Sequence, residues 1–170
     1  MKNFLVFSVT IICLFILIKN TMTANAKCII NANGTCITKI EKAKSVGNNY
    51  WKGAAKQCGG EKNLPTEQDL LNIKSYIYEK EGDAIALSGD ITTEDIQKAL
   101  NNRPKVNEEH IKEFGGFNKY SNSGLYVFSS KELRNDVYFM SFSEFGSNWA
   151  VVDPKNTKLT SNFVAMCIKH

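Results

Sequence analysis

The sequence predicts an α+β domain, with helices in the first part of the chain and an antiparallel sheet at its end. Apolar residues recur at helical spacing between residues 50 and 114, whereas short β-branched and aromatic runs begin at Leu125. Helices followed by strands indicate helices packed on or beside a sheet. Four cysteines after residue 26 indicate two disulfides, because an even number of cysteines in an exported chain is typical of a disulfide framework.

The first 26 residues have the features of a secretory signal peptide. Lys2 precedes an almost unbroken apolar run at 4–18, and an A-x-A site follows at 24–26. A basic start, an apolar core of about 7–15 residues and such a site are typical of a cleaved signal. Retention as an N-terminal anchor is the alternative. We expect an exported protein (periplasmic, cell-surface or secreted) that meets the membrane only through residues 1–26, if these stay attached.

The charge pattern predicts no nucleic-acid partner. The full chain has a net charge of +4, and its lysines and arginines are scattered rather than gathered on one face. Zinc is disfavoured because no C-x-x-C occurs and the only histidines are His110 and His170. We therefore expect no metal and no cofactor.

Residues 28–39 predict a β-hairpin. β-branched residues lie on both sides of Asn33-Gly34, and the favoured two-residue turn needs positive φ at both central positions. Cys28 and Cys36 flank this turn, so a local disulfide between them is expected, although the four cysteines allow three pairings. Residues 27–48 are interpreted as a hairpin and linker.

Two main helices are expected next. The later part of 40–58 has small and aromatic residues at helical spacing, and Gly59-Gly60 supplies a left-handed stop. Thr66, with Asp69 three residues later, predicts a capped start for the second helix. The second helix is expected to end at Gly82.

Two weaker helices and four strands complete the predicted elements. The third helix begins at Thr92 or Thr93 and ends before Pro104, and the fourth covers 107–114. The predicted strands form an antiparallel meander over 125–128, 137–142, 148–153 and 162–168. Turn-forming residues separate them at 135–136, 146–148, 153–154 and 161–162.

The order of motifs resembles the Fibrobacter major paralogous domain family, which comprises small exported bacterial domains with a C-type-lectin-like fold. The matching positions are Trp51, Ala55, Cys58, Gly59, Leu64, Pro65, Thr66, Asp69 and Leu70, then Ser143, Glu144, Ser147, Asn148, Ala150, Val164 and Cys167. The resemblance implies a lectin-like domain over 49–170, with an insertion at about 83–122. It also implies a disulfide from the first helix to the last strand, Cys58–Cys167.

The sequence departs from the sugar-binding lectins of this fold. The Glu-Pro-Asn type tripeptide and the Trp-Asn-Asp that hold calcium and sugar are absent, and Arg134-Asn135-Asp136 retains only the last two letters. Calcium-dependent sugar binding is therefore not expected. The acidic groups Glu79, Glu81 and Asp83 and Glu94-Asp95 lack the spacing of a calcium loop and are interpreted as surface charges.

Cys58 and His110 are candidates for a nucleophile and its base, since a reactive cysteine needs such a partner. The export signal favours a bridge for Cys58, and His110 in Glu108-Glu109-His110 is interpreted as a solvated helix residue. We therefore expect no catalytic residue. The alternatives are a secreted enzyme with its site in the unaligned middle segment and a structural envelope protein.

The predicted function is a non-enzymatic binding module for an unidentified protein or glycan. Phe145, Asn148 and Trp149 lie at and beside the turn predicted at 146–148, where loops on a rigid scaffold commonly carry binding. The alternative for the two aromatic residues is packing in the core.

Overall fold

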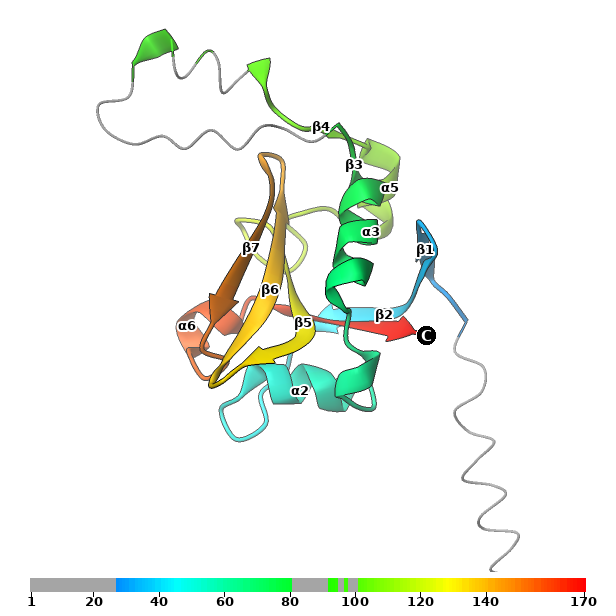
Figure 1. The fold of residues 1–170 in the computed structure, drawn as a ribbon, viewed down its shortest axis with the longest axis vertical. Helices are drawn as coiled ribbons and strands as arrows, with labels where there is room; N and C mark the ends of the chain where they lie inside the picture. The colour runs from blue at the N-terminus through cyan, green and yellow to red at the C-terminus, as the bar shows by residue number, and fades with distance from the viewer. Residues whose placement is uncertain (1–26, 81–91, 95–96, 98–100) are drawn as a thin grey trace, which may run out of the picture.

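The computed structural model describes residues 27–80, 92–94, 97 and 101–170 (Figure 1). The predicted signal peptide, and residues 95–96 and 98–100 of the predicted third helix, lie outside these residues. In chain order the elements are β1 (Ile30–Ala32), β2 (Thr35–Lys42), α2 (Tyr50–Gln57), η1 (Glu61–Asn63), α3 (Glu67–Ile77), β3 (Tyr78–Lys80), β4 (Lys105–Val106), α5 (Glu108–Glu113), β5 (Leu125–Leu133), β6 (Asp136–Ser143), β7 (Gly146–Val152), α6 (Thr157–Thr160) and β8 (Val164–Lys169). None of the helices in the described ranges is long and apolar enough to cross a membrane.

The main sheet has six strands in the order β1-β2-β8-β5-β6-β7, and β3 and β4 form a separate pair. The α+β prediction is confirmed, but the prediction of a purely antiparallel sheet is wrong. The last strand, β8, pairs in parallel with β5, with Val127 opposite Val164, and antiparallel with β2. It runs parallel to β7, and parallel strands cannot be joined by a tight turn. The segment 153–163, which contains α6, therefore carries the chain back to the middle of the sheet.

Strands β5, β6 and β7 form the predicted meander, but both of its tight turns lie earlier than expected. Leu133 is opposite Asp136, and Ser143 is opposite Gly146. The second turn is therefore Glu144-Phe145, and residues 146–148 belong to β7. The antiparallel ladder with β6 continues without interruption to this turn, so these residues are paired as a strand.

The N-terminal hairpin is confirmed and is part of the main sheet. Asn33 and Gly34 have φ angles of 49° and 91°, as the two-residue turn requires. The Cys28–Cys36 disulfide joins its two sides, with the Cα atoms 5.2 Å apart. Because β2 pairs with β8, the hairpin extends the sheet rather than leading up to it.

Helix α2 ends at the predicted glycine stop, and it begins at a side-chain cap, Asn49. The side chain of Asn49 accepts a hydrogen bond from the Lys52 amide at 2.8 Å, and the Gly59 and Gly60 amides donate to carbonyls of the last turn. Within the helix, a Cβ at Gly53 would lie 1.5 Å from the Lys44 carbonyl oxygen. Only glycine allows the backbone before α2 to approach this closely.

Helix α3 has the predicted capping box but ends earlier than predicted. Thr66 accepts from the Asp69 amide, and the Asp69 carboxylate accepts from the Thr66 amide. The helix ends at Ile77 rather than at Gly82, because the backbone becomes extended at Tyr78 and pairs with β4. Gly82 itself lies outside the described residues. The short helix predicted at 107–114 is α5, capped by the side chain of Asn107.

Apolar side chains cover both faces of the sheet. Alternate residues of β8 point to opposite faces, so Val164 and Met166 join one cluster while Ala165 joins the other. The first cluster packs against α3 and α5, and the second packs against α2 (Figure 1). On the α2 side, the Trp51 indole donates to the Ser129 carbonyl oxygen at 2.8 Å.

The Cys58–Cys167 disulfide fastens α2 to β8, with the Cα atoms 5.1 Å apart. It links residues 109 positions apart in the sequence. The pairing that the family resemblance implied is therefore confirmed. Two disulfides in one domain are typical of proteins that fold in an oxidising compartment.

Candidate functional site

The end of the β6–β7 hairpin is held by one buried hydroxyl group. Tyr78 lies directly after α3, and its hydroxyl donates toward the carbonyl oxygens of Ser143 and Gly146, at 2.8 and 2.9 Å. The same oxygen accepts from the Ser143 amide at 3.0 Å. Burial raises the pKa of Tyr78, and the hydrogen bond to Ser143 opposes this rise only in part. The phenol therefore stays protonated and fixes the position of the hairpin end.

Two of the three predicted binding residues are exposed aromatics of this hairpin. Phe145 lies in the two-residue turn and is 71% exposed, and the guanidinium of Arg103 lies 5.2 Å from the centre of its ring. Trp149 is 39% exposed and lies in β7, not at a turn.

The structure separates Asn148 from Trp149. Consecutive residues of a strand point to opposite faces, so Asn148 does not share a face with the indole. Val151 takes its place, because it lies two residues from Trp149 and is 46% exposed. Sequence analysis missed Val151, although strict alternation along a correctly placed strand would have found it.

These side chains lie along an unpaired edge of the sheet. Strand β7 is last in the strand order, so one side of its backbone has no neighbouring strand in the described sheet. We call Trp149, Val151 and the outer backbone of β7 the β7 edge. Tyr138 of β6 lies opposite Val151 in the β6–β7 ladder. The ring of Tyr138 lies 4.9 Å from the ammonium group of Lys131.

Cys58 and His110 do not form a catalytic pair. Cys58 is in a disulfide, so it has no thiol that could attack a substrate. His110 stacks on Tyr76 with the ring centres 3.7 Å apart, and its Nδ1 lies 2.7 Å from the Tyr76 carbonyl oxygen. The prediction of a solvated histidine is therefore wrong, because the imidazole is half-buried between α5 and α3.

The acidic groups weighed as calcium ligands are only partly described. Glu79 forms an ion pair with Lys105 across the β3–β4 pair. Glu81, Asp83 and Asp95 lie outside the described residues. Within the described part of the chain, no three His, Cys, Asp or Glu side chains are grouped as a metal site would require.

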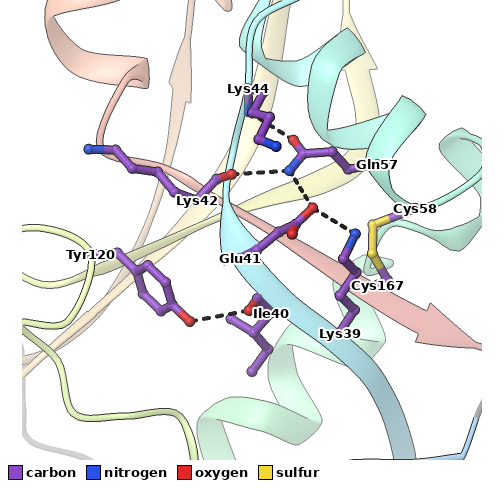
Figure 2. Close-up of polar contacts among 9 residues, drawn as sticks. All are labelled: Lys39, Ile40, Glu41, Lys42, Lys44, Gln57, Cys58, Tyr120 and Cys167. Carbon is purple, nitrogen blue, oxygen red and sulfur yellow. Dashed lines mark hydrogen bonds and ion pairs between the residues drawn. A yellow bond between two sulfur atoms is a disulfide. The ribbon is translucent and has the colours of Figure 1, made fainter.

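A polar network joins β2 to α2 beside the Cys58–Cys167 disulfide (Figure 2). The Glu41 carboxylate accepts from the Lys39 ammonium group, at 2.7 Å, and from the Gln57 amide. Gln57 also bonds the backbone of Lys42 and Lys44. The hydrogen bond from Lys39 lowers the pKa of Glu41, against the opposing effect of burial. This arrangement fixes the strand relative to the helix.

Two surface depressions, of about 380 and 480 Å³, open on other parts of the molecule. Neither is lined by His110, Phe145 or Trp149. The β7 edge, with an unpaired strand backbone and exposed apolar side chains, is a surface suited to contact with an extended partner.

Comparison with known proteins gives no family model, no curated protein and no solved structure that matches this chain.

Proposed function

We propose that this chain is an exported, non-enzymatic interaction module with a C-type-lectin-like fold, and that it binds an extended segment of a partner protein along the β7 edge. The observation that carries the proposal is the exposure of Trp149 and Val151 on the outermost strand of the sheet.

Export and the lectin-like fold are supported by separate features. The signal-peptide features of residues 1–26 and the two disulfides both favour an oxidising compartment outside the cytoplasm. The lectin-like fold is supported by the Cys58–Cys167 bridge from α2 to β8, which matches the bridge that the resemblance implies.

The edge of the sheet offers two kinds of interaction to an extended chain. Unpaired backbone groups along β7 can hydrogen-bond an added strand, and main-chain bonds of this kind supply affinity in strand addition. Trp149 and Val151 provide apolar area on one face, and tryptophan is enriched among residues that dominate binding energy. Specificity would come from the side chains that meet this apolar pair.

The anchored β6–β7 hairpin favours binding because it is already ordered before a partner binds. Tyr78 fixes the turn between β6 and β7 by three hydrogen-bond contacts to its hydroxyl. A surface that is ordered before binding loses less conformational entropy when the complex forms.

Selection of short random peptides on the immobilised full-chain protein tests this function. Peptides that bind should lose affinity by about tenfold or more when Trp149 is replaced by serine, the expected loss for a central interface residue. Leu159→Ser is the matched control, because Leu159 is an exposed apolar residue that belongs to α6 and not to β7. N-methylation of the peptide backbone should also abolish binding if the peptide adds as a strand.

Equal affinity for the wild type and Trp149→Ser would overturn the role of the β7 edge. A glycan array that yields a ligand whose binding is lost in Trp149→Ser would instead identify a glycan as the partner.

A further inference from the structure

A polar depression of about 380 Å³ lies on the surface beside β2, away from the β7 edge. Its wall is the loop 118–123, which precedes β5, and Lys42 and Asn162 complete the lining. These three parts of the chain are far apart in sequence and are brought together by the pairing of β2 and β5 with β8. The volume falls within the range of about 300–1,000 Å³ that is usual for small-molecule sites.

The loop that forms the wall is fixed to the scaffold. The hydroxyl of Tyr120 donates to the Ile40 carbonyl oxygen at 3.2 Å (Figure 2). The Tyr120 ring packs on the apolar cluster that contacts α3 and α5. Ser121 is buried, and the hydroxyl of Ser123 lies 2.8 Å from that of Tyr126. The wall is therefore ordered before any ligand arrives, which lowers the entropic cost of binding.

The charged groups of the depression are both positive. Lys42 and Lys119 line it, and no carboxylate does. In Figure 2 the Lys42 side chain points away from the Glu41 network, which uses only the Lys42 carbonyl oxygen. The Lys119 ammonium group lies 5.2 Å from the centre of the Tyr120 ring. Among the described residues neither ammonium group is paired with a carboxylate. The Lys119 side chain lies against Gly115, where this depression borders the second one, and its ammonium group is open to an anion there.

Three carboxamides line the same depression, from Asn118, Asn122 and Asn162. Their side chains make no hydrogen bond to the rest of the described chain. A carboxamide can donate and accept at once, so it matches the hydroxyl groups of a ligand, which also do both. Ammonium groups together with free carboxamides therefore suit a ligand that has both a negative charge and hydroxyl groups.

We propose that this depression binds a small acidic saccharide, a sugar that carries a carboxylate or a phosphate group. Lys42 and Lys119 bind the anionic group, and the asparagine side chains bind the hydroxyls. The nearly all-polar lining disfavours an apolar ligand, since such a ligand would leave these groups without partners. This site is independent of the β7 edge and uses no metal ion.

Amide chemical shifts of the full-chain protein, with both disulfides formed, test the proposal. The anionic probes are glucuronic acid and glucose 6-phosphate. Glucose is the neutral match, and inorganic phosphate is the anion without hydroxyl groups. We expect both acidic sugars to shift the amides of 118–123 and Asn162, and glucose and phosphate to bind at least about tenfold more weakly, because each lacks one class of contact.

Lysine variants inside and outside the depression distinguish a specific binding site from general electrostatic attraction of anions to the protein. Lys42→Gln/Lys119→Gln should weaken binding of the acidic sugars by about tenfold or more, the loss expected for charge-assisted hydrogen bonds. Lys62→Gln removes the same charge from the exposed helix η1, outside the depression, and should leave the affinity unchanged. If the double variant is misfolded, as judged from its spectrum, Asn122→Ala is used and should weaken both acidic sugars.

Three results would overturn the proposal. One is the absence of shifts at 118–123 with every probe. Another is an equal loss of affinity in Lys62→Gln. The third is binding of inorganic phosphate as tight as that of the sugars, which would indicate an adventitious ion only.

Discussion

The two ends of the main sheet are held in different ways. At one end, the Cys28–Cys36 disulfide closes the β1–β2 hairpin. The Cys58–Cys167 disulfide links β8 to α2, and the Glu41 network links β2 to α2. At the other end, β7 is bonded only to β6, and the hairpin they form is anchored through the hydroxyl of Tyr78. Two large apolar side chains, Ile29 and Val46, are exposed near the cross-linked end, whereas the open hairpin exposes three, Phe145, Trp149 and Val151. The difference indicates that one end maintains the fold and the other is available for contact.

Loss of the Cys58–Cys167 disulfide should have the largest effect on stability. The double variant Cys58→Ser/Cys167→Ser should lower the free energy of unfolding by about 4–5 kcal/mol, because the bridge closes a loop of more than a hundred residues. Urea unfolding without reductant measures the change. Cys28→Ser/Cys36→Ser is the comparison, with an expected loss of about 2–3 kcal/mol for its short loop. A larger loss from the short loop would contradict the chain-entropy explanation.

Removal of the Tyr78 hydroxyl should affect the open end of the sheet. Tyr78→Phe removes the side-chain hydroxyl that bonds the Ser143 amide, the Ser143 carbonyl and the Gly146 carbonyl, at a cost of about 1–3 kcal/mol. Hydrogen exchange at Ser143 should accelerate while exchange in β2 and β8 stays unchanged. Tyr120→Phe, which removes a hydroxyl bonded to β2, is the control and should leave Ser143 unaffected.

Ionisation of Tyr78 should make the stability of the fold depend on pH in the alkaline range. Since burial raises the pKa of Tyr78 in the folded state, its contribution to stability is complete below the ordinary tyrosine pKa of about 10. It is lost as the pH rises from that value through the folded pKa. The stability of the wild type should therefore fall more steeply above about pH 10 than that of Tyr78→Phe.

Glu41 should give a smaller effect, at the cross-linked end and at acid pH. Its folded pKa is lowered, so its contribution is present above the ordinary glutamate pKa and is lost as the pH falls through the folded pKa. Glu41→Gln should cost less than about 1 kcal/mol at neutral pH, as for exposed ion pairs, and should flatten the acid limb of the stability curve. Glu61→Gln, in the exposed helix η1, should leave that limb unchanged. An acid limb of equal slope in the wild type and Glu41→Gln would show that the network contributes nothing.

Trp149→Ser should have the smallest effect on stability. An exposed residue on an edge strand typically changes stability by no more than about 0.5 kcal/mol. Thermal unfolding of this variant therefore distinguishes a surface residue that is available to a partner from a residue that packs in the core. A loss as large as that of Tyr78→Phe would mean that Trp149 belongs to the core, the alternative that the sequence left open.

Local features of the fold could be predicted from the sequence. Asn33-Gly34 predicts its turn because few residues tolerate positive φ at both positions, and Thr66 with Asp69 predicts a helix start by side-chain capping. The Cys58–Cys167 pair was available only through resemblance, because spacing alone cannot distinguish three possible pairings.

Non-local features could not be predicted in this way. The position of β8 depends on pairing with β2, more than a hundred residues away, and no local pattern encodes such a partner. The turn at Glu144-Phe145 contains no strong turn former, so the Gly-Ser-Asn that follows it was taken for the turn. Tyr78 was missed for the same reason, since its partners Ser143 and Gly146 lie far along the chain. The sequence therefore identified the exposed aromatic residues of the β6–β7 hairpin, but it grouped Asn148 rather than Val151 with Trp149.

The central position of β8 determines when the chain can fold. The β1–β2 hairpin and the β5–β6–β7 meander belong to one sheet only because β8 lies between them. As the chain is synthesised, these two pieces have no shared hydrogen bonds until residues 164–169 are available. Contacts of such long sequence separation are slow to form, so we expect folding over milliseconds to seconds rather than microseconds. Until then Cys58 lacks its partner Cys167, and the other cysteines after residue 26 with which it could form an incorrect disulfide are Cys28 and Cys36.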